Sequence, residues 1–291
     1  MHTSAIALNF SIHKMSNLLS EKRRLEDRQI TPPLYTECYG EGDETLVFLA
    51  GLGGTTRYWK SRIAPLTRSH KIILVDLLGF GESPKPWIRY SADHHIEALR
   101  GTLATLGPFT IIGHSLGALL AVAYAARFPE QIKNMVLMSL PYFGSEEDAY
   151  RYFRKNRNDR LRGLVVTNMG LTIIACLITR RVLGKFLPYL IRDMPKEVVA
   201  DLVKHTWISS TSSLWEVVYR YDALSDILRI PERIDVLCIH GDRDTTAPLF
   251  SLDLIQKHRP GWRIEMLHDV DHHPFLRDTA RCIELIKNIV P

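Results

Sequence analysis

Residues 109–127 read FTIIGHSLGALLAVAYAAR, and this stretch decides the fold. The apolar run Phe109–Ile112 predicts a buried strand, and Leu116–Arg127 is apolar nearly all round, as a buried helix should be. Ser115 stands between them in the pattern G-x-S-x-G. A serine on such a tight strand-to-helix turn holds its hydroxyl above the sheet, and small neighbours prevent a clash. Ser115 is therefore the candidate nucleophile; a chance glycine pattern at this junction is the alternative.

The same turn supplies a candidate hydrogen-bond donor for an oxyanion. The backbone N–H of Leu116 lies at the N-terminus of the predicted helix, where partial positive charge gathers. A second donor is expected from the glycine-rich loop 50–55, which follows a predicted strand. We assign it by position to Leu52, while Gly53 stays open and a plain glycine turn is the alternative.

Short β-branched runs alternate with helix-length segments in most of the chain. This alternation predicts an α/β fold, in which helices wrap a parallel sheet. Strands are expected at Leu34–Tyr39, Thr45–Leu49, Lys71–Val75, Phe109–Ile112, Met135–Met138, Asp235–Ile239 and Arg263–Met266. Helices are expected at Ala92–Leu106, Leu116–Arg127 and Pro274–Ile289, among others.

The alternation stops between Tyr142 and Ile230, where the sequence is helical and locally charged. We therefore expect an α/β core at 31–141 and 231–291, a helical insert at 142–230, and an N-terminal extension at 1–30.

A basic cluster lies in this insert, formed by Arg151, Arg154, Lys155, Arg157, Arg160 and Arg162. Its plain interpretation is a solvated helix face. The alternative is that these side chains, with the apolar stretches Met169–Ile178 and Val182–Ile191, attract an anionic membrane surface or an acidic substrate.

The candidate acid lies in the loop Gly241–Pro248, which follows a predicted strand. Open α/β sheets gather functional groups at the carboxyl ends of their strands. Both Asp242 and Asp244 qualify there, and the residues alone leave the choice between them open.

The candidate base lies in the loop before the C-terminal helix, where three histidines compete. His268 stands too near the end of a strand, and His273 directly precedes the proline that should open the helix. We therefore choose His272, since an imidazole can take a serine proton at pH 7 and return it. Serine, aspartate and histidine then follow one another in an order known for such sites.

Composition argues against several other classes. A formal net charge of +5 and a pI near 9.0 are modest for 291 residues, so no nucleic-acid partner is expected. The four cysteines are scattered, which argues against structural zinc and disulfides. No apolar run reaches the roughly 18 residues of a membrane-spanning helix, and no secretory signal is recognised, so a cytoplasmic protein is expected.

From about Tyr35 onward the chain resembles the α/β-hydrolase superfamily, in particular its capped branch of esterases, lipases, lactonases and carbon–carbon bond hydrolases. Beyond the serine turn, DLLGFGES at 76–83 is similar to the family's D-x-x-G-x-G-x-S turn. Gly241–Pro248 is similar to the family's acid loop, which puts the acid on Asp244 and the base on His272. Two residues depart from the pattern: Ala50 stands where histidine is usual, and Asp271 where glycine is usual.

The resemblance implies a mostly parallel sheet flanked by helices, with a helical cap inserted after the sixth strand. It implies cleavage of a carboxylic ester through an acyl-enzyme, with Ser115, His272 and Asp244 as catalytic residues, Leu52 and Leu116 as oxyanion donors, and no cofactor or metal. The partner would be a small apolar acyl or ester substrate. The alternatives are thioester, lactone or carbon–carbon bond cleavage, and a small-molecule-binding protein that has lost the chemistry.

Overall fold

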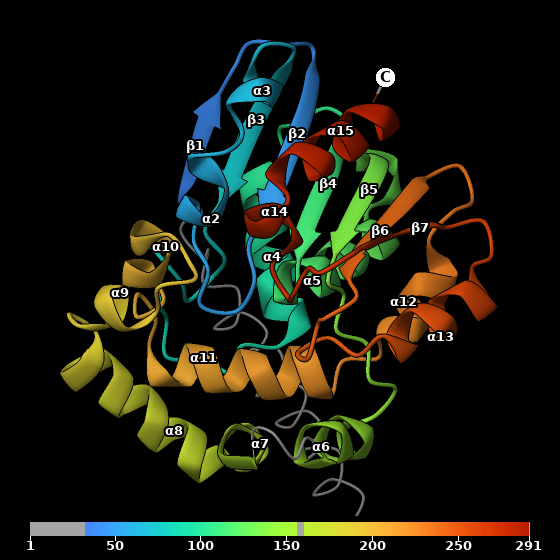
Figure 1. Cartoon of the computed structure of the whole chain (residues 1–291). Helices are drawn as coiled ribbons and strands as arrows, with labels where there is room; N and C mark the ends of the chain where they lie inside the picture. Colours follow the sequence, from blue (N-terminus) through green and yellow to red (C-terminus); the bar gives the residue numbers. More distant parts are fainter. Residues whose placement is uncertain (1–32, 156–159, 291) are drawn as a thin grey trace, which may run out of the picture. The chain divides into compact units, whose positions relative to one another are not determined.

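A seven-stranded sheet lies at the centre of the described part of the chain (Figure 1). The computed structural model describes residues 33–155 and 160–290. The strands are β1 Thr36–Tyr39, β2 Glu44–Leu49, β3 His70–Val75, β4 Phe109–His114, β5 Ile132–Met138, β6 Asp235–Gly241 and β7 Arg263–Leu267. They lie in the order β1-β3-β2-β4-β5-β6-β7, and within this sheet β1 alone is antiparallel to its neighbour. The predicted α/β fold is confirmed.

Helices cover both faces of the sheet, because successive strand residues point to opposite sides. In β2, Val47 and Leu49 join a core with α4, α5, α12 and α13, whereas Leu46 and Phe48 join a second core with α2, α3, α14 and α15. The bounds of these helices and of one 3-10 turn are α2 Arg57–Lys60, α3 Ala64–Thr67, α4 Ala92–Leu103, α5 Leu116–Arg127, η1 Pro129–Gln131, α12 Ala223–Arg229, α13 Phe250–His258, α14 Pro274–Arg277 and α15 Thr279–Ile289.

Two helix predictions differ from the structure. The helix expected at 92–106 ends at Leu103. The single helix expected at 274–289 is two helices, α14 and α15, with a break at Asp278. The Asp278 side chain accepts a hydrogen bond from the backbone N–H of Arg281 (3.0 Å), so it caps the N-terminus of a new helix instead of continuing the old one.

The insert is helical and lies beyond the carboxyl ends of the strands (Figure 1). Its helices are α6 Glu146–Lys155, α7 Arg160–Val166, α8 Met169–Ile178, η3 Thr179–Leu183, α9 Leu187–Leu190, α10 Lys196–Asp201, α11 Trp207–Ser213 and η4 Leu214–Tyr219, of which η3 and η4 are π-helical. We call residues 142–222 the cap segment. It follows β5, the fifth strand; the expected position after a sixth strand is wrong, because only five strands precede it among the described residues.

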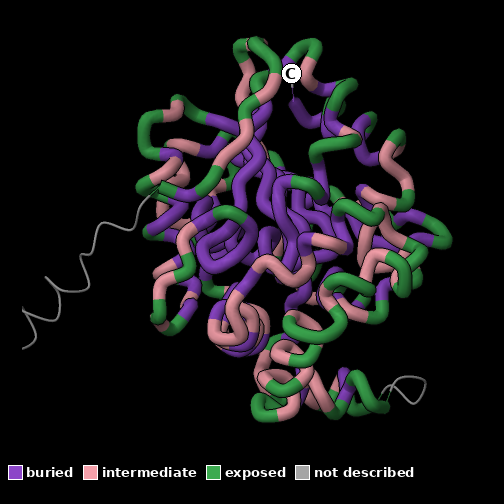
Figure 2. Tube along the Cα trace, turned by 90° about the vertical axis from the view of Figure 1, so that its left-hand side faces the viewer, coloured by how far each residue is buried: buried purple, intermediate pink, exposed green. Residues whose placement is uncertain are grey.

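The last part of the expected insert belongs with the core. Helix α12 packs on α5, and its residues Ala223 and Ile227 are fully buried in the same hydrophobic cluster. The tube through the strands is buried, while much of the tube through the cap helices is intermediate or exposed (Figure 2). The expected extension at 1–30 lies outside the described residues.

The described helices include no single one that has the length and apolarity to cross a membrane. Helix α7 and the continuous run Met169–Leu183 meet both criteria only as a pair, and they are bent by 105° relative to each other.

Candidate active site

Ser115 occupies a strained turn between β4 and α5. Its φ of 53° and ψ of −117° are rare for a residue with a side chain, and its N–H donates to the carbonyl of Met138 (2.9 Å). A Cβ atom on Gly113 would lie 2.4 Å from the carbonyl oxygen of Gly117, and one on Gly117 would lie 2.3 Å from that of Leu49. Close backbone packing therefore requires both glycines of the motif.

Three side chains from distant parts of the sequence meet at this turn. The Nε2 atom of His272 lies 2.9 Å from the Ser115 hydroxyl, and its Nδ1 atom lies 2.8 Å from a carboxylate oxygen of Asp244. Because a carboxylate only accepts, Nδ1 carries the proton, which leaves Nε2 free to accept the hydrogen of the serine hydroxyl. The structure thus brings together the three residues that the sequence singled out.

Asp244 is buried and fully hydrogen-bonded. Its second oxygen accepts the backbone N–H groups of Thr246 and Ala247, both at 2.8 Å. Burial alone would raise the pKa of Asp244, but the hydrogen bond and charge of His272, with smaller contributions from His240 and Ala247, lower this pKa to about 2. The carboxylate therefore stays ionised at neutral pH.

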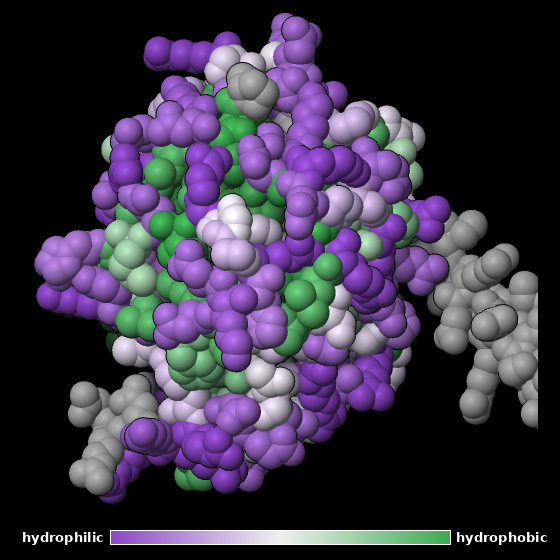
Figure 3. Space-filling model, turned by 90° about the vertical axis from the view of Figure 1, so that its right-hand side faces the viewer, coloured by the Kyte–Doolittle hydropathy of each residue, from purple (hydrophilic) through white to green (hydrophobic). Residues whose placement is uncertain are grey.

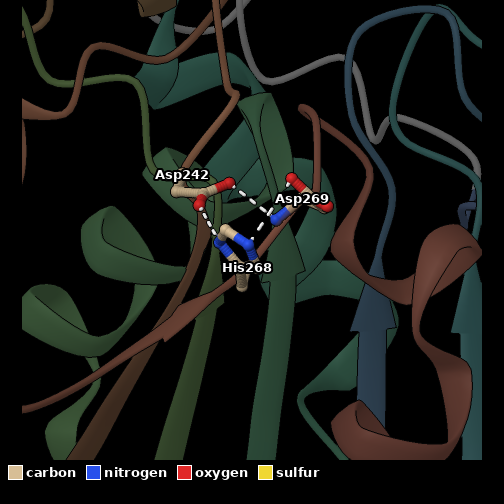
Figure 4. Close-up of side chains that lie close together, drawn as sticks. All are labelled: Asp242, His268 and Asp269. Atoms are coloured by element: carbon tan, nitrogen blue, oxygen red, sulfur yellow. Dashed lines mark hydrogen bonds and ion pairs between the residues drawn. The ribbon is translucent and has the colours of Figure 1, made fainter.

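Asp242, the other candidate acid, faces a different histidine. Its carboxylate binds the Nδ1 atom of exposed His268 (2.7 Å) and accepts the backbone N–H of Asp269 (2.8 Å), as Figure 4 shows. These three residues could offer ligand atoms to a metal ion, but all have partners already, since Arg243 pairs with Asp269. The group is a hydrogen-bonded turn at the protein surface.

The two candidate amide donors belong to segments that adjoin the serine, the start of α5 and the loop after β2. The first helical hydrogen bonds of α5 are donated by Ala118 and Leu119 to the Ser115 carbonyl, so the amide of Leu116 precedes the helical ladder. In the loop after β2, Gly54 donates to Gly51 (2.9 Å), which closes a turn around the next two residues. Leu52 lines the same pocket as Ser115.

Gly53 occupies the second central position of that turn with a φ of 76°. A side chain there would face Leu202, the residue directly after α10, and Gly53 does not line the described Ser115 pocket. This position favours Leu52 over Gly53 as the second candidate donor.

Comparison with known proteins agrees with this fold. The family model for the alpha/beta hydrolase fold matches residues 44–168. The solved structure of E-2-(acetamidomethylene)succinate hydrolase superposes with a TM-score of 0.70 at 18% identity, covering 88% of this chain and 94% of that one. This chain has the alpha/beta hydrolase fold.

Curated relatives of the hydrolase-fold chain are distant. Lipase 1 of Psychrobacter immobilis is 26% identical over 305 residues, which cover 99% of this chain and 92% of that relative. The probable lysophospholipase BODYGUARD 2 of Arabidopsis thaliana is 26% identical over 274 residues, which cover 84% of this chain but only 58% of the relative.

A pocket of about 260 Å³ lies at Ser115, between the sheet edge and the cap segment. The core side is lined by Gly51, Leu52, Gly54, Tyr58, His114, Ser115, Pro141, Thr246, His272 and His273. The cap side is lined by Phe153, Arg162, Met194, Val198, Leu202, Leu214 and Val218, all but one of them apolar. A larger hollow of about 480 Å³ lies beside Arg151 and Phe250, and it includes none of the three hydrogen-bonded residues.

The loop after β2 is held without the histidine that Ala50 replaces. The Thr55 hydroxyl donates to buried Asp201 of α10 (2.7 Å), and the N–H of Thr56 donates to buried Asp76 (2.7 Å). Asp76 belongs to a motif that the sequence pointed out. Asp201 carried no such signal, because it lies in the cap segment far along the chain.

The histidine loop is also held from two sides. The Nε2 atom of buried His114 donates to the His272 carbonyl (2.7 Å), while the His114 ring stacks on Tyr58. Asp271 stands where the family has glycine, and it accepts the N–H of His273 (3.0 Å) and pairs with Arg277 (2.6 Å). These contacts fix the loop in place of the missing glycine.

Proposed function

We propose that the hydrolase-fold chain is a serine hydrolase that cleaves carboxylic esters through an acyl-enzyme. The observation that carries this proposal is the continuous hydrogen-bonded line from Ser115 through His272 to Asp244, beginning at a strained serine turn. Nucleophile, base and orienting acid are arranged as this chemistry requires.

In the first half-reaction, the Ser115 oxygen attacks the ester carbonyl carbon while His272 takes the hydroxyl proton. The carbonyl π electrons move to oxygen, and the amides of Leu52 and Leu116 stabilise the resulting oxyanion. The carbonyl then re-forms, the bond to the alcohol oxygen breaks, and His272 returns the proton to the departing alcohol. Asp244 stabilises the transient imidazolium throughout.

In the second half-reaction, His272 removes a proton from water as the water oxygen attacks the acyl-enzyme. The same amides stabilise the second oxyanion. Its collapse breaks the bond to the Ser115 oxygen, which recovers the proton from His272, and releases the carboxylic acid.

An apolar acyl group is the substrate portion that fits the pocket best. Six of the seven cap residues that line the pocket are apolar, and the volume of about 260 Å³ suits a small to medium chain. The names of a lipase and a probable lysophospholipase among the relatives support an ester substrate.

Labelling with a fluorophosphonate probe tests the nucleophile. The wild-type chain should label at one serine, and Ser115→Ala should abolish labelling. Ser139→Ala is the matched control. Ser139 directly follows the neighbouring strand β5 and also has a positive φ, of 49°, but its hydroxyl has no partner among the described residues. An unlabelled wild-type chain would favour a binding protein without chemistry.

A panel of p-nitrophenyl esters of increasing chain length tests the reaction. We expect turnover that depends on chain length and falls on the order of 10⁴-fold or more in Ser115→Ala. Acyl thioesters, lactones and vinylogous diketones run beside the esters distinguish the alternatives. Preference for any of these over every ester would contradict the ester assignment while leaving the nucleophile intact.

A further inference from the structure

The outer cap helices expose an unusual amount of hydrophobic surface. Of the sixteen large hydrophobic side chains exposed in the described structure, ten lie between residues 161 and 190. They are Leu161, Leu164, Met169, Ile174, Ile178, Val182, Leu183, Phe186, Tyr189 and Leu190. We call α7, α8, η3 and α9 together the cap ridge; α7 and α8 lie on the side of the cap away from the sheet, and α9 lies at the edge of the cap beside α10 (Figure 1).

One face of the ridge is apolar where a helix normally turns polar side chains to water. Ile174, Ile178 and Val182 follow one another at four-residue spacing along the continuous α8–η3 helix, so they share a face. They are 55%, 47% and 62% exposed. By contrast, the side of the molecule that carries β7 and α13 is mostly hydrophilic, with hydrophobic side chains only between polar ones (Figure 3).

The charge around the ridge has a single sign. The sequence from 160 to 192 contains six arginines and lysines and no aspartate or glutamate. Arg181, Lys185 and Arg192 are exposed, and no ion pair joins them to another described residue. An apolar face bordered by basic side chains matches an anionic lipid surface, in which acyl chains lie beneath negatively charged headgroups.

The cations of the ridge overlap only in part with the basic cluster expected from sequence, since Arg160 and Arg162 alone belong to both. Arg151 pairs with Asp148 (2.6 Å), and Arg154 donates to Thr167 (2.9 Å), so both are engaged within the cap segment. Arg157 lies outside the described residues.

We propose that the cap ridge docks on an anionic lipid surface, with Ile174, Ile178 and Val182 entering the headgroup boundary and Arg181 and Lys185 contacting the headgroups. The ridge is connected to the pocket at both ends of its sequence. Arg162, near the start of the ridge, and Met194, just after its end, both line the pocket. Docking therefore holds the pocket near lipid acyl chains. Delivery of an ester from the lipid rests on the proposed function; docking itself does not.

Sedimentation of the full chain with vesicles tests this surface. Phosphatidylcholine vesicles with and without phosphatidylglycerol are compared at low and high salt. We expect binding that needs phosphatidylglycerol and weakens with salt. Ile174→Ser, Ile178→Ser and Val182→Ser together should abolish binding. Arg181→Gln with Lys185→Gln should weaken it about 25-fold at low salt, since each cation contributes roughly fivefold.

Two control variants test whether binding depends on the ridge itself and not on any exposed hydrophobic or basic side chain. Leu228→Ser removes an equally exposed hydrophobic side chain from α12, and Lys257→Gln removes an exposed cation from α13; neither should change binding. Circular dichroism verifies that each variant is folded, and a short water-soluble ester tests the pocket separately. Vesicle binding without ester turnover would contradict the proposed function only.

Three outcomes would overturn the proposal. The first is a wild-type chain that does not sediment with anionic vesicles. The second is binding that resists both high salt and alkaline carbonate, which would mean that α7 and α8 insert into the bilayer. The third is a dimer in light scattering that the Ile174, Ile178 and Val182 substitutions dissociate, which would mean that a second copy covers the ridge.

Discussion

Asp244 remains charged although water is largely excluded from it. Burial is the largest single influence on its pKa and would raise it, but the hydrogen bond and charge of His272, with His240 and the Ala247 amide, together outweigh burial and lower the pKa to about 2. Two backbone N–H groups hold the other oxygen, so the carboxylate cannot rotate away from the imidazole. In the proposed reaction, a fixed negative charge here would stabilise the imidazolium that forms when His272 accepts the Ser115 proton.

Asp244→Asn should lower kcat on the order of 10⁴-fold for an ester that the wild type cleaves. An amide can present its NH₂ group to His272, which favours the wrong imidazole tautomer and removes the stabilising charge. Asp242→Asn is the matched control two residues away, and it should change kcat little because Asp242 pairs with His268. Steady-state kinetics of both variants measure kcat. An equal loss of kcat in the two variants would contradict the assignment of Asp244.

Individual candidate site residues could be predicted from sequence where the local backbone geometry requires particular amino acids. Ser115 was found because its turn demands glycines on both sides, and His272 because two neighbouring histidines could be set aside. The residues alone could not separate Asp242 from Asp244, since both lie in one loop and only the folded turn decides which carboxylate faces the imidazole. Leu52 was assigned by its position in the loop with Gly53 left open, and the turn that separates the two residues is visible only in the structure.

At the scale of elements, strands were predictable and contacts between distant elements were not. Each strand follows from a local run of β-branched and apolar residues, so all seven were found. The contact between Thr55 and Asp201 joins the loop after β2 to α10 across 146 positions. Lys204 and Arg57 lie 3.1 and 3.4 Å from the Asp201 carboxylate and balance its buried charge. The cap segment therefore helps to hold the loop that carries Leu52.

Thr55→Val should lower kcat about tenfold with a smaller change in KM. The substitution keeps the shape of the side chain but removes the hydrogen bond to a charged group, so the loop loses its tie to the cap segment. Steady-state kinetics on one ester would measure the split between kcat and KM.

Thr55→Ser restores the hydroxyl and should recover most of the activity. Glu197→Gln serves as the control, because it removes an exposed carboxylate from the same helix as Asp201. If Thr55→Val kept the wild-type kcat, the loop would be held by Asp76 and its own turn alone.

At the scale of the whole molecule, the packing that builds the site also buries several imidazoles. Burial lowers the pKa of His95 to about 3 and that of His273 to about 4, and it lowers the pKa of His114 and His240 as well. In the unfolded chain each imidazole titrates near its ordinary value of about 6.5. Between pH 6.5 and 4 these imidazoles therefore bind more protons in the unfolded state than in the folded state, and their contribution to the free energy of unfolding falls as the pH falls.

His95→Phe should make this loss of stability less steep. It removes one imidazole that is neutral when folded and becomes protonated when unfolded. Between pH 6.5 and 5 the free energy of unfolding should therefore fall, on average, by about 1.1 kcal/mol per pH unit less than in the wild type. The phenyl ring keeps a flat shape against Phe80 but loses the contact with Ser213. Urea unfolding between pH 6.5 and 5 measures the slope, with exposed His268→Gln as control. An unchanged slope in His95→Phe would mean that the buried imidazole already takes up a proton in the folded protein.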